Sequence, residues 1–375
     1  MAWQSGESGE SGESGESGES GESGEARAGG RSGSAMAARA LISSREGIVG
    51  AWNPLTTTPP NYVGNPECLD RWSTPVRIRI LQAELLSGIY YDCGENSVAV
   101  EYRSREKPNL LQALVHMIRP NPEDFVSQLE WVNNYAALRM ERSSEIMTEI
   151  TDILSFLGSV GMLHPDRTRR TFELLNLVLR TVGVIEMRVK HALACRRPVE
   201  YSPQIQPMIE TPGHGSLPSG HSTESFAAAF VFFALINQVR TGGFISDYKD
   251  CKDPTFVQLM RLAERIAINR TVAGLHFPVD SVAGMVLGQT MAEFFVARLC
   301  GGCSPTQRTF DGRGFNDDFI YERVLAKDYV RKVKANPADN DKIITGDTPL
   351  HVEPSPQLQY LWEQAFEECK LMIVP

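Results

Sequence analysis

The sequence predicts an all-α protein, a helical bundle with little or no strand. Apolar residues recur at helical spacing through most of the chain after residue 75. Alternating apolar and polar residues, the pattern of a half-buried strand, are scarce. The segment Phe226–Asn237 is apolar on nearly all sides, which indicates a central helix surrounded by others. We expect one core over roughly residues 70–305.

The first half of the chain contains several expected helices and one candidate strand. Val76–Gly88 and Asn109–Met117 are apolar segments, and the second stops before a proline. Ser97–Tyr102 alternates and is the best candidate for a short strand. Apolar residues between 146 and 157 recur at i, i+4, i+7, i+8 and i+11, which predicts one helical face. Asp166–Ala194 carries the same spacing over a longer stretch.

The second half of the chain alternates helices with polar loops. Pro198–Pro218 is rich in proline and is expected to be a long loop, the kind of connection that often carries function. Thr241–Pro254 is a second polar loop. Helical spacing returns in Phe256–Ala273 and Val279–Leu299, and a last helical patch covers Gln357–Leu371.

The N-terminus has a composition that cannot form a core. Residues 5–25 are seven tandem copies of Ser-Gly-Glu without an apolar side chain, so we expect disorder there. Four regions follow from these patterns. They are a disordered tail (1–40), an N-terminal extension packing on the bundle (41–110), a helical domain (111–305) and a C-terminal wrap over the bundle (306–375).

Charge and cysteine usage exclude some functions. The formal net charge is −9, and the seven repeat glutamates leave about −2 for the rest, so a basic nucleic-acid-binding surface is not expected. The seven scattered cysteines do not suggest a disulfide framework, and Cys300-Gly-Gly-Cys303 is best interpreted as a glycine-rich turn after a helix. We find no signal peptide, and the apolar stretch Phe226–Ile236 is too short to span a bilayer. A soluble, cytoplasmic protein without a transmembrane segment is therefore expected.

The first of three basic clusters is "KHALACRRP". Lys190 and Arg197 are seven residues apart, so a continuous helix would place them on one face. Pro198 disfavours helical geometry at Arg197 and ends the run. Taken alone, the cluster is equally typical of a solvated helix end.

The second cluster is the turn Pro218-Ser219-Gly220-His221, which comes just before the apolar helix. Free backbone N–H groups at a helix start favour an anion. Gly220 permits close approach to the backbone, and Ser219 adds a hydroxyl donor. The alternative is an ordinary N-cap turn, which His221 makes less attractive.

The third cluster is "RTVAGLHFPVD". His276 and Asp280 are four residues apart, which allows a hydrogen bond that orients the imidazole. Pro278 fits the first turn of a new helix, so His276 should lie just before that helix. Arg270 ends the preceding helix. A lone histidine here would usually be a core residue, but together the clusters supply one Lys, two Arg, a Ser-Gly turn and two His. That set is suited to a tetrahedral oxyanion.

The three clusters together resemble the signature of the PAP2 superfamily, which contains type 2 phosphatidic-acid phosphatases and vanadium-dependent haloperoxidases. The resemblance covers about residues 185–285, with Asn269 where the family usually has Ser. It implies a helical bundle of the PAP2/haloperoxidase type, with a catalytic domain over 111–305. It also implies that vanadate or phosphate contacts the residues of the three clusters, namely Lys190, Arg197, Ser219, Gly220 and Arg270.

The resemblance also implies the catalytic roles. His276 would be the nitrogen ligand of vanadate or the phosphatase nucleophile, His221 the general acid–base, and Asp280 the group that orients His276. In a haloperoxidase Lys190 would also polarise bound peroxide.

Within the superfamily we favour a vanadium-dependent haloperoxidase that uses hydrogen peroxide to oxidise bromide or iodide in the presence of a small organic acceptor. His214 stands where haloperoxidases carry a second residue of the site, and it would tune the halide. Met187 replaces a tryptophan common in those enzymes, which opposes this assignment. A soluble acid phosphatase acting through a phosphohistidine is the alternative, and a non-catalytic anion-binding scaffold is a second one. The resemblance also suggests a homo-oligomer.

Overall fold

The computed structural model describes residues 35–50, 64–245, 248–326, 343–345 and 350–373. Contacts divide the chain into two compact units, Met1–Arg77 and Ile78–Pro375. The first unit contains α2 (Ala35–Ile48) and a 3-10 turn, η1 (Pro66–Arg71). Most of the predicted disordered tail, residues 1–34, lies outside the described residues. Every candidate site residue belongs to the second unit.

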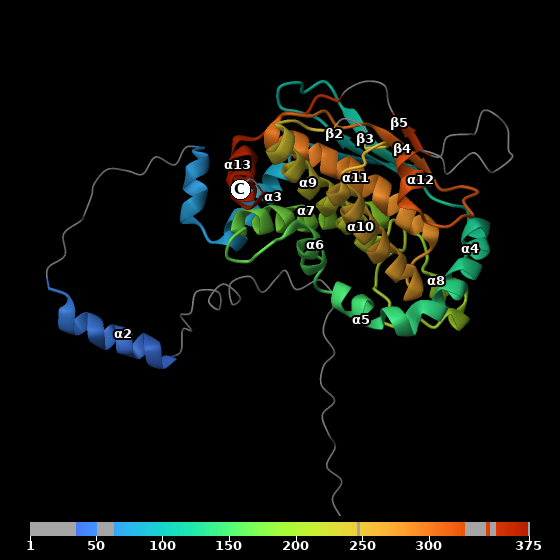
Figure 1. The fold of residues 1–375 in the computed structure, drawn as a ribbon, viewed down its shortest axis with the longest axis horizontal. Helices are drawn as coiled ribbons and strands as arrows, with labels where there is room; N and C mark the ends of the chain where they lie inside the picture. Colours follow the sequence, from blue (N-terminus) through green and yellow to red (C-terminus); the bar gives the residue numbers. More distant parts are fainter. Residues whose placement is uncertain (1–34, 51–63, 246–247, 327–342, 346–349, 374–375) are drawn as a thin grey trace, which may run out of the picture. The chain divides into compact units, whose positions relative to one another are not determined.

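The second unit is mainly helical, which confirms the predicted fold class (Figure 1). The boundary between the two units falls within α3 (Thr74–Leu86). The remaining helices are α4 (Pro122–Tyr135), η2 (Ala136–Leu138), α5 (Arg139–Glu149), α6 (Leu154–Gly161), α7 (Arg169–Leu193), α8 (Pro198–Tyr201), η3 (Pro203–Ile205), α9 (Gly220–Thr241), α10 (Pro254–Val272), α11 (Pro278–Cys300), α12 (Tyr321–Leu325) and α13 (Pro356–Ile373).

The long helices follow the sequence pattern closely. The predicted helices at 166–194, 226–237, 256–273, 279–299 and 357–371 are α7, α9, α10, α11 and α13. Helix α9 packs against the other four, and its side chains from Phe226 to Ile236 are all buried. Helix α11 ends at Cys300 and is followed by Gly301 in a left-handed conformation, which confirms the glycine-rich turn. The apolar helix predicted to be central is therefore the centre of the bundle.

A small sheet lies beside the bundle, with strand order β1-β2-β3-β4-β5 (Figure 1). The strands are β1 (Ile89–Cys93), β2 (Ser97–Tyr102), β3 (Gln112–Ile118), β4 (Arg308–Asp311) and β5 (Ile343–Thr345). Neighbouring strands are antiparallel except for the parallel pair β3 and β4. Strand β2 has the bounds predicted for it, whereas the helix predicted at 109–117 is wrong. A short apolar run has no distinctive period, and here hydrogen-bonding partners on both sides make it a strand.

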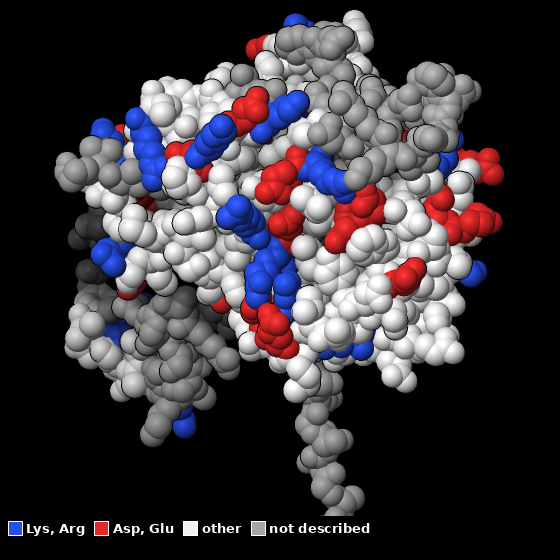
Figure 2. All heavy atoms as spheres, turned by 45° about the vertical axis from the view of Figure 1, so that its right-hand side comes forward, with Lys and Arg blue, Asp and Glu red and all other residues white. Residues whose placement is uncertain are grey.

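Charges of both signs are mixed on the face of the protein that Figure 2 shows. There, Lys and Arg side chains lie next to Asp and Glu side chains, with uncharged residues between the groups. Some exposed charges are directly paired, as in the 2.6 Å contact of Arg313 with Asp311. Exposed pairs of this kind contribute little to stability, so the fold depends on its buried helices.

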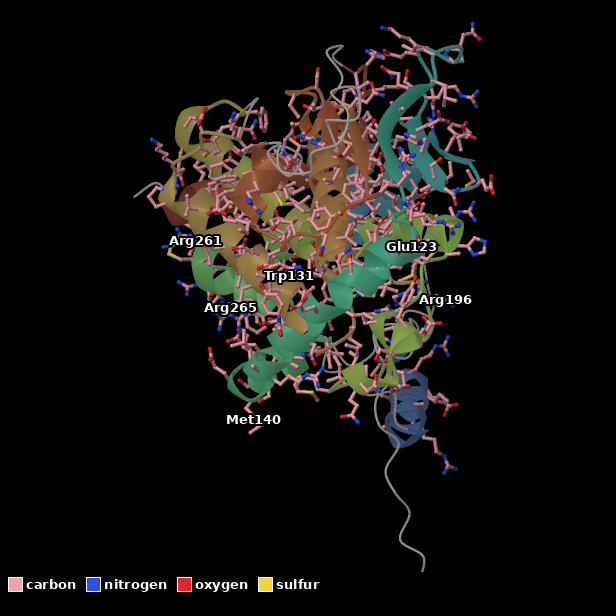
Figure 3. All side chains as sticks on the ribbon, turned by 90° about the vertical axis from the view of Figure 1, so that its right-hand side faces the viewer. Glu123, Trp131, Met140, Arg196, Arg261 and Arg265 are labelled. Carbon is pink, nitrogen blue, oxygen red and sulfur yellow. The ribbon has the colours of Figure 1, made fainter. Side chains whose placement is uncertain are left out.

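The helix predicted through 146–157 is also wrong, because the chain turns between α5 and α6. Asp152 Oδ1 accepts a hydrogen bond from Ser155 N at 2.9 Å, which caps the start of the second helix. Ile146 and Leu157 are nevertheless both buried. Figure 3 shows the solvent side of this region, where Met140 in the first turn of α5 is 90% exposed.

Two glycines allow α9 and α11 to approach closely. A Cβ atom on Gly288 would lie 2.5 Å from the carbonyl oxygen of Thr223, and one on Gly284 would lie 2.6 Å from Cβ of Ser222. Real side chains do not fit at these distances, so only glycine permits the crossing. The contact places the first turns of α9 and α11 side by side.

The prediction that no segment is long enough to span a bilayer is wrong. Among the described residues, α9 and α11 have lengths of 22 and 23 residues and a mean hydropathy that would allow either to cross a membrane. The prediction counted only the uninterrupted apolar run, but the helices extend it with small and weakly polar residues. In the structure, 78% and 94% of the two apolar windows are buried.

Candidate active site

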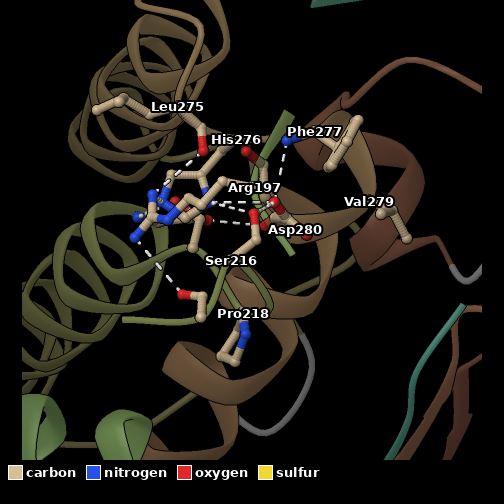
Figure 4. A network of polar contacts seen from close by, with 12 residues as sticks. Arg197, Ser216, Pro218, Leu275, His276, Phe277, Val279 and Asp280 are labelled. Carbon is tan, nitrogen blue, oxygen red and sulfur yellow. Dashed lines mark hydrogen bonds and ion pairs between the residues drawn. The ribbon is translucent and has the colours of Figure 1, made fainter. Parts of the chain in front are cut away.

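The three predicted clusters meet where α7 ends and α9 and α11 begin. Lys190 Nζ donates to the carbonyl oxygen of Pro218 at 2.5 Å, which joins the first cluster to the second. Ser219 N donates to the carbonyl oxygen of Asp280 at 2.9 Å, which joins the second to the third. Arg197 lies 3.0 Å from His276, which joins the third to the first (Figure 4). Residues separated by as many as 90 positions therefore form one site.

Asp280 holds His276 in place. His276 Nδ1 lies 3.1 Å from Asp280 Oδ2, and the same oxygen accepts hydrogen bonds from Phe277 N at 3.0 Å and Ser216 Oγ at 2.5 Å (Figure 4). Helix α11 begins at Pro278, so His276 lies just before it, as predicted. Burial raises the pKa of Asp280 to about 6, while its hydrogen bonds oppose that rise.

The contact with Arg197 decides which nitrogen of His276 carries the proton. A guanidinium group can only donate, so His276 Nε2 accepts the hydrogen bond from Arg197 Nη1. The proton of the neutral ring therefore lies on Nδ1 and is donated to Asp280. Burial, with the charges of Arg197 and Lys190, holds the pKa of His276 well below its usual value. The result is a neutral imidazole whose Nε2 lone pair faces a cation.

Lys190 and Arg197 reach the site from different elements. The prediction that they share a helical face is wrong, because α7 ends at Leu193 and Ala194 adopts a left-handed conformation. Arg197 lies in the following loop as the residue before Pro198, and it donates to the carbonyl oxygens of Leu275 and His214 at 3.1 Å each.

Lys190 is the cation that ties the loop to α7. It is 1% exposed, and besides Pro218 its ammonium donates to the carbonyl oxygens of Gly215 at 3.3 Å and Ser216 at 3.4 Å. Burial lowers the pKa of Lys190 to about 8, although nearby Glu186 opposes that change.

The start of α9 carries the second histidine. Ser219 is the N-cap, and its hydroxyl accepts a hydrogen bond from Ser222 N at 3.4 Å. Gly220 is the first residue of the helix. His221 Nε2 lies 3.0 Å from the carbonyl oxygen of Glu149, which can only accept, so Nδ1 is the nitrogen left to take a proton. Burial and then Arg270 hold the pKa of His221 well below its usual value.

Arg270 is anchored by a carboxylate that the sequence did not reveal. Its Nη2 donates to Glu149 Oε2 at 2.6 Å and to the carbonyl oxygen of Ile146 at 3.1 Å. Both charged side chains are 1% exposed. Asn269, the departure from the family pattern, donates to the other oxygen of Glu149 at 2.7 Å. Within the described residues, Nε of Arg270 is buried without a hydrogen-bond partner, so it remains available to a ligand.

His214 lies beside Arg197. Arg197 Nη2 is 3.1 Å from His214 Nδ1, and the same nitrogen lies 3.2 Å from the carbonyl oxygen of Gly215. Burial and the charges of Lys190 and Arg197 lower the pKa of His214 to about 4, so the ring is neutral near pH 7. Met187 is 41% exposed.

Sequence reasoning missed four polar residues at the site. Glu149 and Ser216 stand outside the three motifs and are brought in by the tertiary structure. Glu186 is one helical turn before Lys190, so its spacing could have revealed it. Glu224 lies just after the first turn of α9, and the sequence assigned it only to the helix start.

Fold and site together define a helical protein in which buried cations and two histidines are gathered at the ends of three helices. Residues 172–299 match the model of the PAP2 superfamily. The chain is 32% identical over 94 residues to a vanadium-dependent bromoperoxidase of Ascophyllum nodosum, covering 22% of this chain and 17% of that protein. It is 38% identical over 88 residues to diacylglycerol pyrophosphate phosphatase 1 of Saccharomyces cerevisiae, covering 23% and 30% respectively. The similarity therefore spans less than a third of either relative.

These findings correct the expected localisation. A soluble, cytoplasmic protein was predicted, and that prediction is contradicted. One relative is a phosphatase named for diacylglycerol pyrophosphate, which is a lipid. Helices α9 and α11 are also long and apolar enough to cross a membrane.

Proposed function

We propose that this chain hydrolyses phosphate monoesters with His276 as the nucleophile. The observation that supports this function is the tautomer of His276. Its Nε2 lone pair faces the cationic groups, while Asp280 holds the proton on Nδ1. A nucleophile of this kind needs an orienting carboxylate on the far nitrogen and an electrophile on the near one.

The reaction would proceed in two steps. His276 Nε2 attacks phosphorus, the bond to the leaving oxygen breaks, and that oxygen takes a proton from His221. A water molecule then gives a proton to His221 and attacks phosphorus, which breaks the phosphorus–nitrogen bond and releases phosphate. His221 begins neutral because it is buried and cations surround it, and a bound phosphate dianion would raise its pKa toward the protonated form.

The cations would stabilise the transition state. Lys190, Arg197 and Arg270 supply positive charge, and Gly220 N–H and Ser219 stand at a helix start. Phosphoryl transfer depends mainly on positioning and on the neutralisation of the equatorial oxygens. The unpartnered Nε of Arg270, among the residues described, is a donor already oriented inside the protein.

The test is hydrolysis of p-nitrophenyl phosphate by the full chain and by His276→Ala. We expect the variant to lose activity and to lose acid-labile incorporation of phosphate when labelled substrate is quenched. His191→Ala is the matched control, because His191 is exposed in the last turn of the same helix as Lys190. Retention of hydrolysis and labelling by His276→Ala would overturn the proposal.

A second candidate is vanadate-dependent oxidation of bromide or iodide by hydrogen peroxide. The contact between His214 and Arg197 favours it, as does the similarity to a bromoperoxidase. The site fits vanadate because His276 Nε2 is an unprotonated nitrogen and Arg270 Nε is an unpartnered donor among the described residues. His276 would hold the metal, and the cations with Ser219 and Gly220 would hold its oxygens. Bound vanadate would act as a Lewis acid toward peroxide, with His221 accepting a proton.

The two candidates make opposite predictions for vanadate. A phosphatase is inhibited by orthovanadate, whereas a haloperoxidase needs it to halogenate a dye with peroxide and bromide or iodide. Under the second candidate, His214→Phe should change the ratio of bromide to iodide turnover more than it changes vanadate affinity. An unchanged ratio would remove the support that His214 lends to the peroxidase.

A further inference from the structure

A buried carboxyl group lies against the start of α9, and the mechanism above does not use it. Glu186 is on α7, one helical turn before Lys190, and is 2% exposed. A Cβ atom on Gly220 would lie 2.7 Å from Glu186 Oε1, so this carboxyl touches the first residue of the helix. Within the described residues, Glu186 Oε2 is buried and has no hydrogen-bond partner. A buried polar atom with no partner is costly unless a ligand completes it.

A second carboxyl group faces the first. Glu224 is three residues after His221 on α9, and its Oε1 lies 3.8 Å from the position that a Cβ atom on Gly183 of α7 would take. This is an ordinary van der Waals distance, so the carboxyl group of Glu224 lies against α7 at this point. The charged neighbours of Glu186 are Glu224 on α9, Lys190 on α7 and Arg197 in the following loop.

Burial and then the charge of Glu224 raise the pKa of Glu186 to about 8, while Lys190 and Arg197 oppose the rise. Burial also raises the pKa of Glu224 to about 7, although the charges of Lys190 and Arg270 lower it. At neutral pH the two carboxyl groups are therefore not both ionised, and at least one of them carries a proton.

We propose that Glu186 makes the site selective for tetrahedral oxyanions that carry a proton, such as hydrogen phosphate or hydrogen vanadate, over sulfate. The inference rests on the proposed oxyanion site and names the chemistry of the ion that the site accepts. Glu186 is a specificity-determining residue in this sense, because it would contact an oxygen of the anion and not the reacting atoms.

The selectivity follows from the need for one proton between two oxygens. A carboxyl oxygen and an oxyanion oxygen attract each other only when one of them carries hydrogen. Hydrogen phosphate brings a proton of its own, so it can bind to ionised Glu186. Sulfate brings none, so it binds only when Glu186 takes up a proton. Lys190 and Arg197 attract both dianions, so their charges largely cancel in the comparison.

The test measures binding of inorganic phosphate and of sulfate to the full chain by calorimetry at about pH 7.5 and about pH 9. Both ions are mainly dianions over this range. At pH 9, one unit above the pKa of about 8, only about a tenth of Glu186 carries the proton that sulfate requires. The affinity for sulfate should therefore fall, and the preference for phosphate over sulfate should rise by about tenfold in the unchanged protein. In Glu186→Gln the amide donates at either pH, and the preference should change by less than about twofold.

The control variant is Glu173→Gln, which changes another buried glutamate on the same helix. It should keep the rise in selectivity. A preference that stays constant with pH in the unchanged protein overturns the inference, and this result needs no variant to fold. An equal rise in Glu186→Gln, or no binding of either ion, also overturns it. Because no turnover is measured, an inactive chain with this selectivity would refute only the proposed hydrolysis. An active chain without the selectivity would refute only the role of Glu186.

Discussion

Two ion pairs between α5 and α10 allow the contribution of burial at the site to be measured. Glu149 and Arg270 are 2.6 Å apart, and both side chains are 1% exposed. Glu145 and Arg265 are 2.7 Å apart on the same two helices, with Arg265 43% and Glu145 27% exposed. Residue types and shortest distances match, and the pairs differ in burial and in that Arg265 bonds both oxygens of Glu145 whereas Arg270 bonds one oxygen of Glu149. Arg265 is labelled on the outer side of the protein in Figure 3.

The perturbation is truncation of each glutamate to alanine. Glu149→Ala leaves the Arg270 guanidinium buried without its counter-charge, and removal of one partner from a buried pair costs about 3–5 kcal/mol. Glu145→Ala frees Arg265 to water, and an exposed pair is worth about 0–1 kcal/mol. The free energy of unfolding should therefore fall at least about 2 kcal/mol more for the first variant.

The assay is urea unfolding of the full chain, monitored by helical circular dichroism, with the midpoint and slope fitted for each variant. Equal slopes would show that the midpoints can be compared directly. A loss for Glu149→Ala that is no larger than the loss for Glu145→Ala would refute the reasoning. In that case the Arg270 charge would be neutralised by groups other than Glu149.

Three further predictions concern the site and its support. Asp280→Asn keeps the shape beside His276 but removes the charge that stabilises the ring as it becomes cationic, so kcat should fall by about tenfold to thirtyfold, or about 1.4–2 kcal/mol, with little change in phosphate affinity. Gly288→Ala should lower the free energy of unfolding by about 1–3 kcal/mol because its Cβ meets the backbone of α9, whereas Gly213→Ala, which has no atom within 4 Å, should change it by less than about 0.5 kcal/mol. The pKa of His214 is lowered from 6.5 to about 4, so the folded state is stabilised by this residue above pH 6.5 and loses that contribution as the pH falls toward 4. His214→Phe should therefore show a smaller loss of stability in that window, and an unchanged profile in thermal unfolding would contradict the assignment.

Much of the bundle could be predicted because its helices bury one face over many turns. The apolar spacing within α7 and the apolar length of α9 are local properties of the sequence, and they indicate a helix whichever elements pack against it. The helix predicted at 109–117 failed because its fate depended on hydrogen bonds to β2 and β4, and β4 comes almost 200 residues later. The single helix predicted through 146–157 is two helices, because the chain turns after α5 and the side chain of Asp152 caps the start of α6.

The site divides along the same line. Motif spacing alone was enough to indicate the cations, the Ser-Gly turn and the two histidines, because these residues stand next to helix ends that the sequence marks with Pro and Gly. The tautomer of His276, the anchoring of Arg270 by Glu149 and the carboxyl group of Glu186 beside Gly220 became visible only in three dimensions. Each depends on which groups are buried together, and burial sets both the pKa of a carboxyl group and the strength of an ion pair. The local sequence therefore shows which charged residues are present, whereas the tertiary packing sets their pKa values and the strength of their ion pairs.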